Sequence, residues 1–158
     1  MTEKSFSPGM TNKATHADAD IILRLYDLRR DPIMREARKF VCFEFWPSSF
    51  DELGKLFTAG GKEFAYWRQV TSYWDMAMSF VTRGALDANL FLDNANEMFF
   101  VYAKIKPFLP ALREAVSPLF WKRIDDFITS SPEAQQKLAI ISRNVERVRE
   151  QRTKSAAA

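Results

Sequence analysis

The stretch GKEFAYWRQVTSYWDMAMSFVTR, residues 61–83, followed closely by DANLFLDNANEMFFVYAKIK, residues 87–106, decides the fold. In the first segment large apolar side chains recur every three or four residues, which places them on one face of a helix: Phe64, Trp67, Val70, Trp74, Ala77 and Val81. Gly84 can adopt the left-handed conformation that ends a helix, and Asp87 can cap the next one. So short a turn predicts an antiparallel helical hairpin.

The remaining segments read as helices that cover this hairpin. Three Asp-Pro or Ser-Pro pairs, at 31–32, 117–118 and 131–132, combine an N-cap with proline at the first helical position, and each predicts a helix start. We therefore expect an all-α fold, a single compact helical bundle of about six to eight helices around the antiparallel hairpin. The expected organisation is a disordered N-terminal tail at 1–17, a helical domain at 18–148 and a basic, frayed C-terminal tail at 149–158.

The sequence of two aromatic runs is compatible with either a strand or a helix. FVCFEFW at 40–46 and MFFVYA at 98–103 are rich in residues that favour β-structure. No partner strand or hairpin turn lies beside either run, and the first continues the apolar stripe of a helix that starts after Asp31. The interpretation we prefer is helical for both.

The composition restricts the chemistry. The chain has 158 residues, one cysteine and one histidine, so neither an internal disulfide nor a metal site built from His and Cys can form. His16 falls in the expected tail, and Cys42 lies in an aromatic run where a thiol usually behaves as a small apolar group. No cofactor is expected. No apolar run reaches the length of about 18 residues that a membrane span needs, and no secretory signal is visible, so a cytoplasmic location is expected.

Charge is concentrated at the C-terminal end. Residues 133–158 contain six basic and three acidic side chains, which equals the net charge of +3 of the whole chain. Arg147, Arg149 and Arg152 are therefore predicted to form an interaction tail for a protein partner or for a homo-oligomer. The basic run at 29–39 is interrupted by acids, and nucleic-acid binding is not expected.

Two groups of acidic side chains are candidates for a site. Asp93 and Glu97 are four residues apart on the second hairpin helix, and with Asp75 they could form a carboxylate site for Mg²⁺. Glu44 falls on an apolar stripe, where a carboxylate must be paired or protonated. A buried ion pair of Glu44 with Arg83 or Arg113 is the expected solution, and the alternative is a functional carboxylate in a pocket.

The run from Trp74 to Arg113 resembles a group of small bacterial helical proteins known only as a domain of unknown function. The resemblance is carried by the Trp74-Asp75 pair on a helix, the turn with Gly84 and Asp87, and the segment that ends at Arg113. It implies an all-α fold and no activity. The function we expect is that of a non-enzymatic protein-interaction or self-association module. The alternative is a small magnesium-dependent hydrolase or ligand-binding protein with a carboxylate site.

Overall fold

A computed structural model describes residues 13–158. Within them the chain forms helices that are joined by turns and short irregular segments, and it contains no strand. The helices are α1 (His16–Arg30), α2 (Pro32–Lys39), α3 (Phe50–Ala59), α4 (Gly61–Thr82), α5 (Ala88–Asn94), α6 (Asn96–Ile105), α7 (Leu109–Ala115), α8 (Lys122–Ser130) and α9 (Pro132–Ala156). A π-helical turn, Phe40–Glu44, continues α2, and a 3₁₀ turn, Lys106–Phe108, follows α6. The predicted all-α fold is confirmed, and both aromatic runs are helical.

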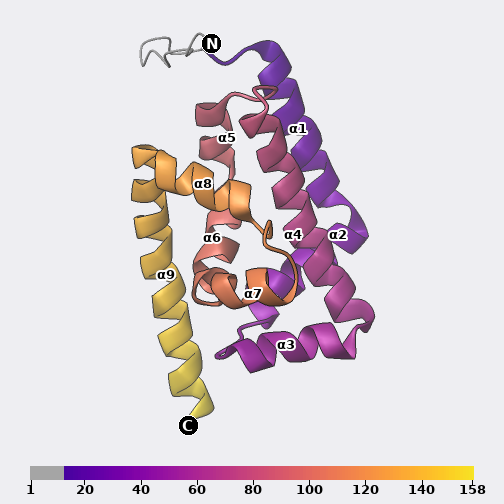
Figure 1. Cartoon of the computed structure of the whole chain (residues 1–158), viewed down its shortest axis with the longest axis vertical. Coiled ribbons are helices and arrows are strands. Elements are labelled where there is room, and N and C mark those ends of the chain that lie inside the picture. The colour runs from indigo at the N-terminus through magenta and orange to yellow at the C-terminus, as the bar shows by residue number, and fades with distance from the viewer. Residues whose placement is uncertain (1–12) are drawn as a thin grey trace.

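The hairpin crosses the middle of the molecule (Figure 1). α4 runs in one direction and α5 and α6 return in the other, with Gly84 at φ 75° in the turn and Asp87 accepting a hydrogen bond from the Leu90 amide. The nearest neighbours of α4 are α2 and α8, whereas α6 packs mainly on α9. The two arms of the hairpin meet through side chains, with the rings of Trp74 and Phe91 6.3 Å apart.

The second arm is broken at Ala95, which sits at φ −105° and ψ 23° between α5 and α6. A continuous helix was predicted over this stretch. The side chain of Asn94 donates to the Leu90 carbonyl at 2.8 Å, and such local bonds compete with the helix ladder. The break lets α6 turn towards α9, so the two halves of this arm serve different layers.

Helix starts follow the predicted caps at two of the three proline pairs. Asp31 accepts from the amides of Ile33 and Met34, and Ser131 accepts from the Ala134 amide. The prediction at Ser117–Pro118 is wrong, because residues 117–121 form a turn and α8 begins only at Lys122.

Both predicted tails differ from the structure where it describes them. α1 begins at His16, two residues before the predicted boundary, because Thr15 and Asp18 form a reciprocal capping box. At the other end α9 extends to Ala156, so residues 149–156 continue the last helix of the domain. The rest of the predicted N-terminal tail, residues 1–12, lies outside the described residues.

The largest side chains of the core are aromatic, and they pack among many aliphatic residues. Trp67, Trp74 and Trp121 are each 2% exposed, and Phe91, Phe99 and Tyr102 are buried with them. Each aromatic ring removes a large area from water, so these six rings contribute much of the buried apolar surface. None of the helices of residues 13–158 is long and apolar enough to cross a membrane.

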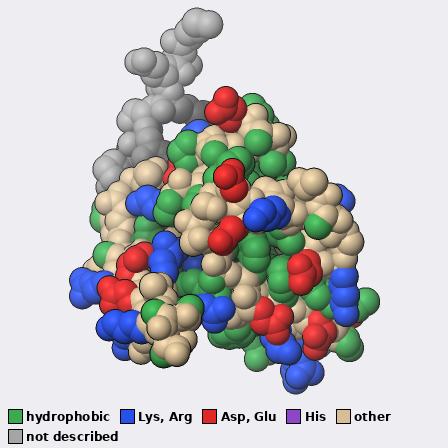
Figure 2. Space-filling model, turned by 90° about the horizontal axis from the view of Figure 1, so that it is seen from below, with side chains coloured by type: hydrophobic (Ala, Val, Ile, Leu, Met, Phe, Trp, Pro, Cys, Tyr) green, Lys and Arg blue, Asp and Glu red, His purple; other side chains and the backbone are tan. Residues whose placement is uncertain are grey.

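On the surface, acids and bases are mixed. Figure 2 shows Lys and Arg interspersed with Asp and Glu, and hydrophobic side chains exposed between them. That face carries no continuous basic patch of the kind that binds a nucleic-acid backbone.

Candidate functional site

A groove with aromatic walls lies between α3, α4 and the turn at 117–121. Its volume is about 490 Å³. Its lining includes five aromatic side chains: Phe57, Phe64, Trp67, Phe120 and Trp121. Polar side chains stand along the rim: Arg68, Ser72, Asp75, Ser117 and Arg123. We call this feature the aromatic groove. Concave, mostly apolar surfaces with a few polar groups are the usual form of a binding site.

The rings of the aromatic groove are ordered relative to one another. Phe120 lies nearly parallel to Trp67, with centroids 6.3 Å apart and an interplanar angle of 7°. It is also nearly parallel to Trp121, at 6.1 Å and 8°. Phe57 meets Trp67 edge-on at 6.1 Å. The wall is therefore a row of offset rings held by mutual contacts. Phe57 and Phe120 are only partly buried and can meet a flat or bulky apolar group, whereas Trp67 and Trp121 are buried and support them.

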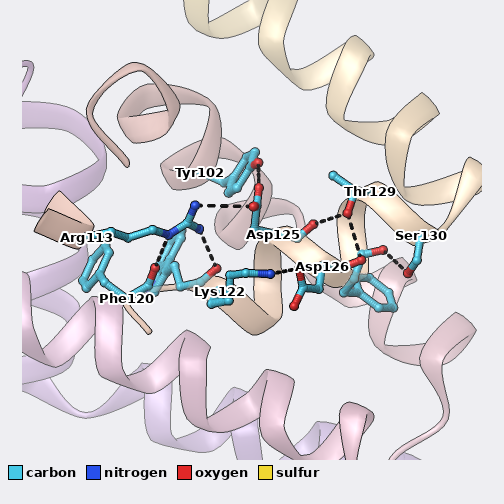
Figure 3. A network of polar contacts seen from close by, with 10 residues as sticks. Tyr102, Arg113, Phe120, Lys122, Asp125, Asp126, Thr129 and Ser130 are labelled. Carbon is cyan, nitrogen blue, oxygen red and sulfur yellow. Dashed lines mark hydrogen bonds and ion pairs between the residues drawn. The ribbon is translucent and has the colours of Figure 1, made fainter. Parts of the chain in front are cut away.

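The turn that carries Phe120 is clamped by one arginine. Figure 3 shows the Arg113 guanidinium between the turn and α8. Its Nε donates to the Phe120 carbonyl at 3.1 Å, and Nη2 lies 3.5 Å from the Trp121 carbonyl. Nη1 pairs with the Asp125 carboxylate at 3.4 Å. The guanidinium thus joins two carbonyl groups of the turn to a carboxylate of α8 in a fixed plane, which a lysine could not do.

Asp125 is held in turn by a tyrosine. The Tyr102 hydroxyl donates to its Oδ1 at 2.5 Å. Burial raises the pKa of Tyr102, and the hydrogen bond to the Asp125 carboxylate raises it further, so the phenol stays protonated as the donor. The clamp is consequently tied to α6 as well as to α8.

Trp121 has an unusual backbone. Its φ of 51° lies in the left-handed region, which a bulky residue occupies at a cost of about 1–2 kcal/mol. The indole N–H donates to the Thr71 carbonyl of α4 at 3.0 Å, and the side chain is 2% exposed. Together with Arg113, this contact holds the strained residue in place. Strain that is kept by surrounding contacts is common at binding sites.

The turn also presents apolar groups to solvent. Leu119 is 76% exposed and Val116 is 51% exposed. The sequence pattern did not indicate this site, because Ser117–Pro118 has the form of a helix start. A helix over 117–121, as predicted, would contain no turn at this place, and it is the turn that exposes Leu119.

The predicted carboxylate site is not assembled. Asp75 lies on the rim of the aromatic groove, where its Oδ1 is 3.7 Å from the Nε of Arg123 and has no hydrogen bond. Asp93 is exposed on α5, while Glu97 belongs to a separate ionic cluster. Within residues 13–158 no group of three or more His, Cys, Asp and Glu side chains is placed to hold a metal ion. The break at Ala95 separates α5 from α6, so spacing along one helix did not apply.

Glu97 is the central acid of its cluster and is 11% exposed at the side chain. Oε2 accepts from Arg38 Nε at 2.7 Å, and Oε1 accepts from the Trp74 indole at 3.2 Å. Arg29 lies 4.0 Å from Oε2 and over the Trp74 ring at 5.4 Å. Two arginines from the run at 29–39 thus neutralise a half-buried acid. The sequence offered no signal for this pairing across 59 residues.

The predicted ion pair of Glu44 with Arg83 or Arg113 is wrong. Glu44 is half exposed and pairs with Lys39 at 3.2 Å. The Phe45 amide bonds to the Phe40 carbonyl, five residues back, so the π-helical turn inserts one residue and rotates Glu44 off the apolar stripe. Arg113 serves the clamp described above, and Arg83 is exposed at the end of α4.

The arginines of the predicted interaction tail divide into two kinds. Arg147 is exposed, and its one side-chain hydrogen bond within the described part of the chain is to Asn144 of α9. Arg149 donates to the Lys104 carbonyl at 3.3 Å, and Arg152 donates to the Phe43 carbonyl at 3.4 Å. Two of the three therefore contact the body of the domain.

Comparison with known proteins places the chain in a family. The family model described as Domain of unknown function (DUF4760) matches residues 14–131. The chain belongs to this family. Every residue that lines the aromatic groove lies inside the DUF4760 match, whereas α9 lies outside it. The predicted resemblance of the segment from Trp74 to Arg113 to a domain of unknown function is thereby confirmed. No curated protein and no solved structure matched the chain in the corresponding comparisons.

Proposed function

We propose that the protein is a non-enzymatic interaction module that takes a large apolar or aromatic side chain of a protein partner into the aromatic groove. The observation that carries the proposal is the clamped turn. It combines a strained Trp121, a row of stacked rings and an exposed Leu119 at one edge of a groove. Aromatic side chains that are rigid before binding contribute area at a small entropic cost.

The available nucleophiles and bases give little support to the alternative, a hydrolase. Burial raises the pKa of the Cys42 thiol to about 12, which keeps it protonated and unreactive at neutral pH. His16 is exposed at the first turn of α1. The carboxylate of Asp75 lies 3.7 Å from the Arg123 guanidinium, a cation that stabilises its charged form. A magnesium-dependent reaction at Asp75, Asp93 and Glu97 has no geometric support, because these residues lie in separate places.

A peptide-display selection tests the proposal. Peptides are selected on the wild-type domain and then measured on Leu119→Asp and on the matched variant Leu23→Asp. Leu119 is 76% and Leu23 62% exposed, so neither substitution removes core packing. We expect the selected peptides to share an aromatic or large aliphatic residue, and to bind Leu119→Asp at least about tenfold more weakly, because a carboxylate would be desolvated at the groove.

The same peptides should bind Leu23→Asp as they bind the wild type. Trp67 and Trp121 line the groove, so peptide binding should also change the tryptophan fluorescence. Peptides that bind both variants equally well, or that shift no tryptophan signal, would refute the proposal.

A further inference from the structure

A second groove lies on another part of the molecule, between the π-helical turn, α6 and α9. Its volume is about 530 Å³. The walls are mainly apolar and include Cys42, Phe43, Phe100, Ile140 and Ile141. Phe43 and Ile140 are 68% and 60% exposed. This α6–α9 groove shares no lining residue with the aromatic groove, and spaces between helices of a bundle are common ligand sites.

The charges along the α6–α9 groove are unequal in what they can still bind. Glu97 lines the groove, but its carboxylate already accepts hydrogen bonds from Arg38 and Trp74. Lys137 lines it as well, and its ammonium group donates to the Leu92 carbonyl and forms no ion pair with the described residues. An ammonium group has three donors, so two remain for a ligand.

The surroundings of Lys137 favour an added anion. The ammonium group lies over the Phe99 ring, 5.7 Å from its centre, and the residue is half-buried. Burial lowers the pKa of Lys137, while the nearby Asp93 acts in the opposite direction. A ligand carboxylate at this position would replace part of the solvation that the ammonium group has lost. Lys137 and Ile141 are four residues apart on α9, so the cation and the apolar wall share one helix face.

We propose that the α6–α9 groove binds a single-chain amphiphile with an anionic head, a long-chain free carboxylate such as dodecanoate. The aliphatic chain lies along Cys42, Phe100 and Ile141, and the carboxylate meets Lys137. The apolar wall excludes a polar ligand, and the single unpaired cation selects an anionic head over a cationic one. The thiol of Cys42 takes part only as an apolar surface. This inference concerns a separate site and does not depend on the proposed function of the aromatic groove.

Displacement of a fluorescent fatty acid tests the inference on the full chain. Dodecanoate, dodecanol and dodecylamine have the same chain and differ only in the head group. We expect dodecanoate to bind about tenfold more tightly than dodecylamine, as one favourable charge contact predicts. Lys137→Gln should remove this preference and leave dodecanol unchanged. Ile140→Ser should weaken all three ligands, because it removes part of the apolar wall without adding a charge, and Leu119→Ser, at the aromatic groove, should weaken none.

Folding of each variant is checked by circular dichroism and by its melting temperature. Asp93→Asn supplies a second variant, which should tighten dodecanoate because a competing acid is removed. Equal binding of the three ligands, or a head-group preference that persists in Lys137→Gln, would overturn the inference. Displacement by phosphatidylglycerol vesicles as effective as that by dodecanoate would also overturn it, in favour of a membrane surface.

Discussion

The ammonium group of Lys104 donates to the carbonyl oxygen of Val41 at 2.6 Å, in a site where Lys104 is 3% exposed. It donates to the Phe45 carbonyl at the same distance and lies 4.2 Å from the centre of the Trp46 ring. No carboxylate pairs with it among the described residues. Lys104 therefore fastens the π-helical turn to α6 through carbonyl groups and an aromatic ring, in place of an ion pair.

This arrangement predicts a pH-dependent stability. Burial lowers the pKa of Lys104 from 10.5 to about 7. Between these values the unfolded chain binds a proton that the folded chain lacks, so the free energy of unfolding should rise with pH. The slope is at most about 1.4 kcal/mol per pH unit, the value for one proton. Urea unfolding from pH 7 to pH 10 measures it, and the difference between wild type and Lys104→Met isolates this lysine. A difference that does not change with pH would contradict the prediction.

Glu97 should be far more important for stability than Asp75, although the sequence placed both in one site. Glu97→Gln leaves Arg38 and Arg29 without their acid in a mostly buried cluster. We expect a loss of about 2–3 kcal/mol in the free energy of unfolding. Asp75→Asn removes only a loose pair at 3.7 Å between partly exposed side chains, with an expected change below about 1 kcal/mol. Equal losses in the two variants would show that the Glu97 cluster is not a structural centre.

The sequence predicted elements better than it predicted partners. Helix starts at Asp31 and Ser131 followed from local capping chemistry, which depends only on neighbouring residues. Pairings such as Arg38 with Glu97 join residues far apart in the chain, and no local pattern encodes them. The aromatic groove was invisible for a related reason, since it depends on the left-handed Trp121 after a proline that normally opens a helix. The π-helical turn likewise made the position of Glu44 unpredictable from helical spacing, because one inserted residue rotates every later side chain about the helix axis.

The two arginines first considered as partners of Glu44 make a matched pair for testing the clamp. Arg113→Met removes the bonds to Phe120 and Asp125 and leaves the strained turn unsupported. The expected loss is about 1–3 kcal/mol, together with altered near-ultraviolet dichroism from Trp121. Arg83→Met, at an exposed helix end, should change the free energy of unfolding by less than about 0.5 kcal/mol. An unchanged aromatic signal in Arg113→Met would mean that the turn holds itself.

Two glycines should respond in opposite directions to the same substitution. Gly84 has φ 75°, where a side chain is strained, so Gly84→Ala should cost about 1 kcal/mol and Gly84→Val more. Gly54 lies inside α3, and a Cβ there meets nothing within 4 Å. Gly54→Ala should therefore stabilise the protein by about 0.5–1 kcal/mol. Thermal unfolding of the two alanine variants is the test, and shifts of the same sign would place the end of α4 elsewhere.

Only a short part of the end of α9, around Arg149 and Arg152, should contribute to stability by contacting the rest of the domain. Residues 153–158 are exposed, and removing them should change the free energy of unfolding by less than about 0.5 kcal/mol. Removing residues 149–158 also deletes Arg149, which bonds to Lys104, and Arg152, which bonds to Phe43 and lies 5.6 Å from the Trp46 ring. We expect this longer truncation to cost about 1–2 kcal/mol, because it uncovers the buried lysine and loses two charged hydrogen bonds.

Calorimetry on the two truncations measures the difference in stability between them, and equal melting temperatures would show that the arginine contacts contribute nothing.

Self-association is a separate property of the same helix. Among residues 13–158 Arg147 bonds only within α9, so it is the tail arginine best placed to meet an acidic partner. If α9 mediates self-association, Arg147→Glu should weaken it in sedimentation at low salt without lowering the melting temperature, and added salt should weaken the wild type in the same way. If neither the charge reversal nor salt changes the sedimentation, α9 does not mediate self-association, and its contacts with the domain are its remaining role.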